Sequence, residues 1–185
     1  MRTELRDAVS GFFAGIELPD NTEHALSDAD IERLVTLADF VTVARSPVER
    51  DRVSRDIELI PDAEAPGRFV GMLAGLLEGL RLIGLDDETA WRLTVKVAFD
   101  SMPAQRRRLI EHLANTETTT APEAAALLGL PTTTVRRTLE DLAAHRVVER
   151  ESAGKGKADV WRLNAEKRLD YAAATVPAMS VSHAS

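Results

Sequence analysis

The sequence contains no cysteine among its 185 residues, and aromatic residues make up only 4% of it. The absence of cysteine excludes disulfide bonds, thiolate metal sites and cysteine nucleophiles. The longest uncharged apolar run covers 69–77, far short of the roughly 20 residues that a membrane-spanning helix needs. The first residues mix charges of both signs before any apolar run, unlike a secretion signal. We therefore expect a cytoplasmic protein without a membrane partner.

The patterns that mark common catalytic sites are also missing. The phosphate-binding pattern GxxxxGK[ST] does not occur, because AGKGKAD at 153–159 lacks both the earlier glycine and a hydroxyl residue after Lys157. No serine lies in a GxSxG context. The histidines fall at no metal-ligand spacing and are expected at the surface: His24, His112, His145 and His183. We predict that the protein is not an enzyme and uses neither a cofactor nor a metal.

Charge is distributed unevenly along the chain. Residues 1–101 hold 11 Lys/Arg and 20 Asp/Glu, a net charge of −9, whereas 102–170 hold 12 and 10, a net charge of +2. Two modules are the natural interpretation, and only the second tolerates a polyanion nearby. We predict a helical, lid-like bundle over 1–101, a second domain over 102–168, and a disordered tail over 169–185.

Apolar residues recur at three- and four-residue spacings in the N-terminal half. This spacing predicts helices over about 3–18, 30–45, 66–83 and 88–100. Ser27 or Asp28 and Asp86 or Asp87 offer N-caps, and Gly84 offers a stop. The segment 45–68 holds three prolines and dense mixed charge, and predicts a connector without regular structure. Its arginines suit either a salt-bridged connector or an anion site: Arg45, Arg50, Arg52 and Arg55.

From Pro103 onward the spacing predicts three short helices, over about 103–115, 121–129 and 133–145. Between the last two lies GLPTTT, in which Gly129 suits a left-handed turn and Thr132 suits an N-cap. Two closely spaced helices joined by a glycine-containing turn are typical of a helix-turn-helix unit.

Two alternating segments follow the third predicted helix, and together they indicate a β-hairpin. They cover 146–152 and 159–163, and we expect Val160 and Leu163 to share one face. The turn between them carries Lys155 and Lys157, which would reach a neighbouring phosphate strand. The predicted fold class is therefore mainly α, with an N-terminal helical bundle followed by an α+β winged helix-turn-helix domain.

The third predicted helix is the one that enters the major groove of DNA in this kind of module. Its apolar stripe of Val135, Leu139 and Leu142 turns hydroxyl and guanidinium groups outward near its N-terminus, and these groups suit phosphates and base edges. The candidate DNA-binding residues are Thr132, Thr133, Thr134, Arg136, Arg137, Lys155, Lys157 and Arg106. The expected partner is double-stranded DNA. The alternative interpretations are that residues 106–108 form a merely solvated face and that GKGK at 154–157 is merely a flexible hairpin.

Residues 102–163 resemble the helix-turn-helix module of MarR-like and ArsR-like regulators, especially in the stretch GLPTTTVRRTLEDLAAHRVVERESAGKGKADVWRL. The stretch from SRDIELIPDAEAPGRF through the wing also resembles the C-terminal part of actinobacterial and phage-type P-loop ATPases, in which a helical lid precedes a winged helix. In such ATPases an arginine at the start of a lid helix senses nucleotide, and Arg68 occupies the matching position. Because the phosphate-binding motif is absent, this second resemblance implies a lid and winged helix without the motor.

Three functions follow from these patterns. The first is a DNA-binding transcriptional regulator whose N-terminal bundle forms a homodimer or contacts a partner. The second is an accessory or separated C-terminal piece of a DNA-acting ATPase, which would work with a partner ATPase. The third is an interaction adaptor whose winged helix does not bind DNA.

Overall fold

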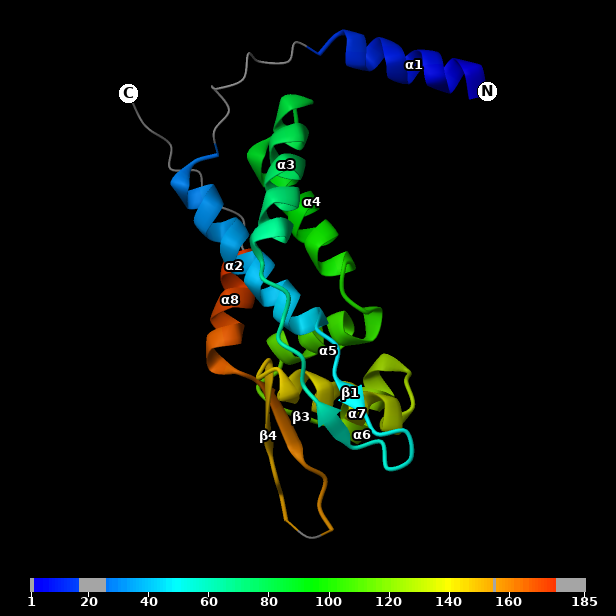
Figure 1. Ribbon diagram of the computed structural model, residues 1–185, viewed down its shortest axis with the longest axis vertical. Helices are drawn as coiled ribbons and strands as arrows, with labels where there is room; N and C mark the ends of the chain where they lie inside the picture. The colour runs from blue at the N-terminus through cyan, green and yellow to red at the C-terminus, as the bar shows by residue number, and fades with distance from the viewer. Residues whose placement is uncertain (1, 17–25, 155, 176–185) are drawn as a thin grey trace.

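The computed structural model describes residues 2–16, 26–154 and 156–175 (Figure 1). Their helices are α1 (Arg2–Ala14), α2 (Asp28–Arg45), α3 (Gly67–Leu82), α4 (Asp87–Asp100), α5 (Ala104–Ala114), α6 (Ala121–Leu128), α7 (Thr132–Ala144) and α8 (Ala165–Thr175). Their strands are β1 (Glu49–Arg50), β2 (Ile57–Leu59), β3 (Thr119–Thr120), β4 (Val148–Glu151) and β5 (Val160–Leu163). The predicted fold class, mainly α with a winged helix near the C-terminus, is confirmed. No helix in this part of the chain is long and apolar enough to span a membrane.

Helices α2, α3 and α4 pack against one another in the N-terminal half, and their ends fall where the sequence predicted. The Ser27 hydroxyl accepts a hydrogen bond from the Asp30 N–H over 3.1 Å and caps α2. The Asp86 carboxylate accepts one from the Thr89 N–H over 2.9 Å and caps α4. Gly84 follows α3 with a φ of 89°, a left-handed conformation that favours glycine.

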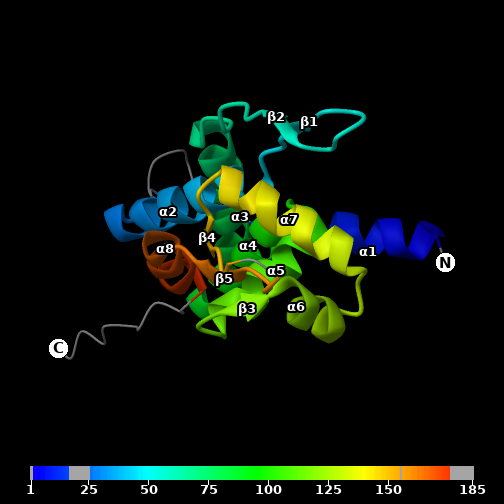
Figure 2. The same cartoon turned by 90° about the horizontal axis from the view of Figure 1, so that it is seen from below.

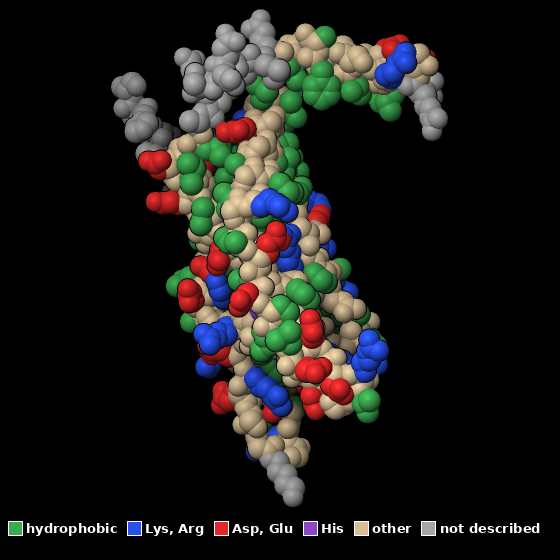
Figure 3. Space-filling model, viewed as in Figure 1, with side chains coloured by type: hydrophobic (Ala, Val, Ile, Leu, Met, Phe, Trp, Pro, Cys, Tyr) green, Lys and Arg blue, Asp and Glu red, His purple; other side chains and the backbone are tan. Residues whose placement is uncertain are grey.

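Helix α1 presents an apolar side that none of the described residues buries. Leu5, Val9, Phe12 and Phe13 are each between 46% and 67% exposed. Figure 3 shows hydrophobic side chains gathered along one side of this helix. Exposed apolar stripes of this kind are typical of surfaces that meet another molecule.

The second half is built from α5, α6 and α7 with a three-stranded sheet in the order β3–β5–β4. Strands β4 and β5 pair antiparallel, with Val148 opposite Leu163. The sequence had not predicted β3, which pairs Thr119 with Trp161 of β5. A strand of only two residues is too short to show an alternating pattern.

Residues 169–175 belong to helix α8, so the prediction of a disordered tail from residue 169 was wrong for this stretch; 176–185 lie outside the described residues. Helix α8 packs along α2. The Tyr171 ring contacts those of Phe40 and Phe99, with centroids 6.0 Å and 5.5 Å apart, and the Trp91 indole N–H donates to the Ala174 carbonyl over 3.0 Å. These contacts order a segment whose many alanines gave little periodic signal.

The connector after α2 also contains more regular structure than predicted. Strands β1 and β2 pair antiparallel, with Glu49 opposite Leu59 and Arg50 opposite Ile57. We call residues 49–59 the connector hairpin. Buried residues of both halves of the chain form one continuous cluster, so the predicted boundary at 101/102 stays a prediction.

Candidate nucleic-acid interface

The turn between α6 and α7 is defined by local chemistry. Thr120 and Glu123 form a capping box at the start of α6, with the Glu123 carboxylate accepting from the Thr120 N–H over 2.8 Å. Gly129 ends α6 with a φ of 64°, the left-handed turn that the sequence predicted. Thr132 was predicted as the N-cap of the next helix, and this was wrong. Pro131 takes the cap position and Thr132 is the first residue of α7.

The N-terminal half of α7 carries the predicted DNA-facing side chains. Val135, Leu139 and Leu142 are buried as predicted. On the other side the structure places Thr132, Thr133, Arg136 and Arg137 in solvent, whereas Thr134 is half-buried. Because Pro131 offers no capping side chain, the first N–H groups of α7 are left without a side-chain acceptor. A helix N-terminus in this state attracts anions.

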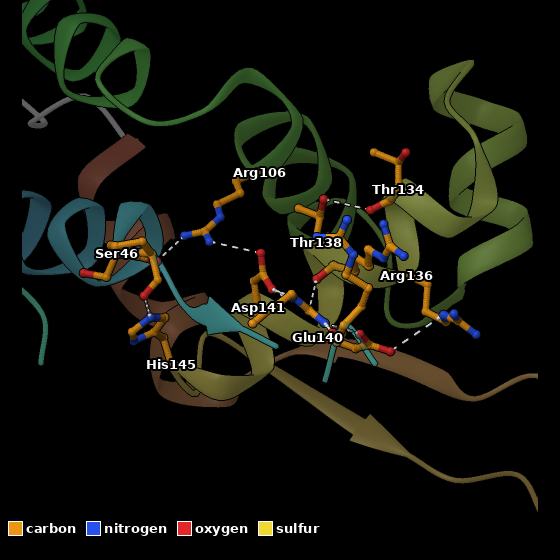
Figure 4. Close-up of polar contacts among 12 residues, drawn as sticks. Ser46, Arg106, Thr134, Arg136, Thr138, Glu140, Asp141 and His145 are labelled. Atoms are coloured by element: carbon orange, nitrogen blue, oxygen red, sulfur yellow. Dashed lines mark hydrogen bonds and ion pairs between the residues drawn. The ribbon is translucent and has the colours of Figure 1, made fainter. Parts of the chain in front are cut away.

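The two arginines of α7 are engaged to different extents. Arg136 is 59% exposed at its side chain and lies 3.7 Å from the Glu140 carboxylate, a long surface ion pair that contributes little. Figure 4 shows Arg136 extending toward Glu140, on the side away from Arg106. The Arg137 guanidinium has no hydrogen bond or ion pair with any residue that the structure describes. Both side chains are therefore available to a phosphate or a base edge.

Arg106 was predicted to bind DNA, and the structure contradicts this. The residue is only 7% exposed, and its guanidinium donates to the Ala44 and Ser46 carbonyls and to the Asp141 carboxylate, the last over 3.3 Å (Figure 4). Two of those acceptors lie about 60 residues earlier in the chain, which is why the sequence concealed the burial. Arg106 thus joins the end of α2 to α5 and α7.

Sequence reasoning also missed the role of Arg50, which joins the connector hairpin to α7. Its guanidinium donates to the Asp141 carboxylate over 2.6 Å and 3.0 Å, to the Glu140 carboxylate over 3.2 Å and to the Arg137 carbonyl over 3.1 Å. Partial burial acts to lower the pKa of Arg50, but hydrogen bonds with Asp141 and Glu140 raise it above its ordinary value. The acidic residues of α7 are thereby compensated, so they oppose a bound polyanion less.

The wing is rooted in the core through β5. Trp161 and Leu163 are 1% and 2% exposed and share the buried face, which corrects the expected pairing of Val160 with Leu163. Successive strand residues point to opposite faces, so 161 and 163 must lie on the same side. Lys157 is exposed near the turn and forms no ion pair within the described residues. Lys155, the other predicted wing residue, lies outside them.

The remaining predicted positions do not assemble into a second site. Arg68 is exposed in the first turn of α3. His112 lies 3.2 Å from the Thr119 hydroxyl and His145 lies 3.0 Å from the Pro47 carbonyl, so both are half-buried rather than free at the surface. His24 and His183 fall outside the described residues. No group of His, Asp and Glu able to hold a metal occurs in the residues described.

The fold and the exposed face of α7 define a winged helix-turn-helix domain. Residues 108–152 match the family model of the IclR helix-turn-helix domain. The matched segment runs from within α5 to just past β4 and covers less than half of the chain. No curated protein and no solved structure matches the chain. The match identifies a helix-turn-helix DNA-binding domain of the transcription-regulator kind. It supports neither the MarR-like and ArsR-like resemblance nor the resemblance to ATPase lids.

Proposed function

We propose that this protein is a transcription regulator that reads duplex DNA with α7 in the major groove and the wing against a neighbouring phosphate strand. This proposal depends mainly on the N-terminal half of α7, where Arg136, Arg137 and Thr133 are exposed beside helix N–H groups that have no side-chain acceptor. Hydroxyl and guanidinium groups at this end of a recognition helix suit both phosphates and base edges. The IclR-type match over 108–152 supports the same assignment.

The electrostatics of the second half support DNA as the partner, although the whole chain carries a net charge of −7. Near α7 the carboxylates of Glu140 and Asp141 are each paired with Arg50. On the wing, Arg150 pairs with Asp159 and Arg162 pairs with Glu149. Arg137 and Lys157 carry no ion pair within the described residues, and Arg136 keeps only the long pair with Glu140. The proposed DNA face is therefore locally positive in a protein that is acidic elsewhere.

The N-terminal half of the chain has a proposed role of its own. We propose that it supplies a homodimer or partner contact, and the exposed apolar side of α1 supports this. Many winged-helix regulators present paired recognition helices to two half-sites, and a dimer contact outside 102–168 would leave α7 unobstructed.

The experiment that tests this function compares a preferred DNA sequence, found by selection from random duplexes, with random DNA of equal length. Replacing Arg136 or Arg137 with Ala should cost about 1–3 kcal/mol on the preferred duplex and much less on random DNA, because base-edge contacts are lost. Leu139→Ala should instead lower the free energy of unfolding by roughly 2–5 kcal/mol, since it opens a cavity under α7.

Each alternative outcome has its own meaning. Equal losses on both DNAs would make the arginines phosphate contacts and the protein a non-specific DNA binder, which overturns the regulator proposal. Absence of any binding by a folded protein would favour the interaction adaptor.

A further inference from the structure

The tip of the connector hairpin carries two unpaired arginines around an exposed valine. Arg52, Val53 and Arg55 are all exposed, and Val53 at 92% is the most exposed large hydrophobic side chain in the described residues. Neither guanidinium has a hydrogen bond or ion pair with a described residue. The sequence had left a salt-bridged connector and an anion site open for this segment. Arg45 and Arg50 fulfil the first interpretation, since Arg45 pairs with Glu64 of the same segment and Arg50 pairs with Asp141 of α7, and Arg52 and Arg55 are left free.

This tip is held directly beside the recognition helix. The guanidinium of Arg50 donates at once to the Arg55 carbonyl over 2.8 Å and to the Arg137 carbonyl over 3.1 Å. One planar group therefore bridges the backbone of the hairpin tip and the backbone of α7, next to an arginine proposed to meet DNA. Figure 2 shows the β1–β2 loop running alongside α7, with the wing strands on the other side of that helix.

The tip is also held in shape by hydrogen bonds of its own. The Asp51 carboxylate accepts hydrogen bonds from the Val53 and Ser54 N–H groups over 2.8 Å and 2.6 Å. The Asp51 N–H donates to the Asp56 carbonyl over 2.9 Å, which closes the loop, and Arg55 adopts a left-handed φ of 65°. A preformed loop loses little conformational entropy on binding. The negative charge of Asp51 is directed into its own turn rather than toward a partner.

We propose that the connector hairpin is a second wing, in which Arg52 and Arg55 bind phosphates of the strand that borders the groove occupied by α7. This inference rests on the proposed function. Its occupant is duplex DNA, because unpaired guanidiniums on a rigid tip suit phosphate and because the neighbouring α7 brings the duplex there. Val53, 92% exposed between the two arginines, then faces the same strand of the duplex. With both wings engaged, DNA contacts flank α7 on two sides.

The opposing possibility is that the same hairpin covers α7. Glu49, Asp56 and Glu58 lie on it, and Arg50 holds it against the helix. In that case, removing the arginines would leave DNA affinity unchanged or raise it, whereas a second wing requires the affinity to fall.

The experiment is a salt titration of the full chain binding a fluorescent random-sequence duplex. In Arg52→Gln with Arg55→Gln, the slope of log K against log salt should flatten by one to two units, since each phosphate contact contributes about 0.9. Arg52→Lys with Arg55→Lys should retain most of the slope. The matched control is Arg68→Gln with Arg92→Gln, which removes two exposed arginines of α3 and α4 and should leave the slope unchanged.

Lys155→Ala with Lys157→Ala serves as the comparison for a wing, and it too should flatten the slope by about one to two units. An unchanged slope or tighter binding in the Arg52/Arg55 variant, with a flattened slope in the lysine variant, overturns the second wing while leaving the proposed function intact. Absence of DNA binding by the unaltered chain overturns both.

Discussion

The β4–β5 wing and the connector hairpin both lie beside helix α7, but different forces hold them in place. The wing is rooted by Trp161 and Leu163, which are 1% and 2% exposed. The connector hairpin has no fully buried residue between 49 and 59, and the Arg50 guanidinium attaches it through hydrogen bonds to α7. Apolar burial is not screened by salt, whereas ionic attachment weakens as ionic strength rises. The two hairpins should therefore respond differently to mutation and to ionic strength.

The largest expected difference between the two hairpins is in the free energy of unfolding lost when a buried apolar residue of the wing is removed. Trp161→Ala should lower the free energy of unfolding by about 3–5 kcal/mol, because it leaves a large cavity under β5. Leu59→Ala is the matched change on the connector hairpin, and because Leu59 is 52% exposed it should cost under about 1 kcal/mol. Urea denaturation measures both. Equal costs would show that the connector hairpin is also held by apolar packing.

A smaller effect should come from the ionic root of the connector hairpin. Asp141→Asn keeps the side-chain shape but removes the charged acceptor shared by Arg50 and Arg106. We expect a loss of about 1–3 kcal/mol of unfolding free energy, toward the lower end because the Asp141 side chain is 21% exposed.

The control for this change lies on the wing. Asp159→Asn breaks the ion pair with Arg150, whose side chain is 51% exposed, and should cost less than about 1 kcal/mol. Amide hydrogen exchange of the Arg55 N–H, bonded to the Asp51 carbonyl, should rise in Asp141→Asn alone. An unchanged rate would mean that the hairpin keeps its place without the Asp141 contact.

The same contrast explains which parts of the molecule the sequence predicted. Helices α5, α6 and α7 were predicted because their apolar spacing, the Thr120 cap and Gly129 are local signals within a few residues. The wing followed from the alternation around 146–163, although the choice of Val160 over Trp161 as its inward residue was wrong. The buried residues of the wing are apolar, and apolar residues in a short strand predict that the strand is partly buried.

The contacts that could not be predicted from the sequence join residues that lie far apart along the chain. Arg50 binds Asp141 over 91 residues, and Arg106 binds Ala44 over 62. An arginine drawn into the interior by distant acceptors has the same local pattern as one in solvent, so Arg106 was placed on the DNA face. Helix α8 is similar, since Phe99 and Trp91, which lie far from it in the sequence, contact its Tyr171 ring and its Ala174 carbonyl. The solvent-exposed residues of α7 could be predicted because burial of one face of a helix determines which residues lie on the other.

The smallest expected difference between the two hairpins lies in their turns. The connector hairpin depends on Asp51, whose pKa lies below its ordinary value because the carboxylate accepts hydrogen bonds from the Ser54 and Val53 N–H groups. Because the folded pKa is lower than the unfolded pKa of about 3.9, the ionised carboxylate stabilises the turn fully at a pH above about 3.9. The turn loses this stabilisation as the pH falls through the folded pKa. The wing turn is instead closed by the Lys157 N–H donating to the Gly154 carbonyl over 3.2 Å. In an NMR titration from neutral pH downward, the Ser54 amide resonance should move with a midpoint below about 3.9, and Asp51→Asn should abolish that movement. A Ser54 midpoint at or above the ordinary value, or one shared with the wing and α7 amides, would show that the carboxylate does not hold this turn.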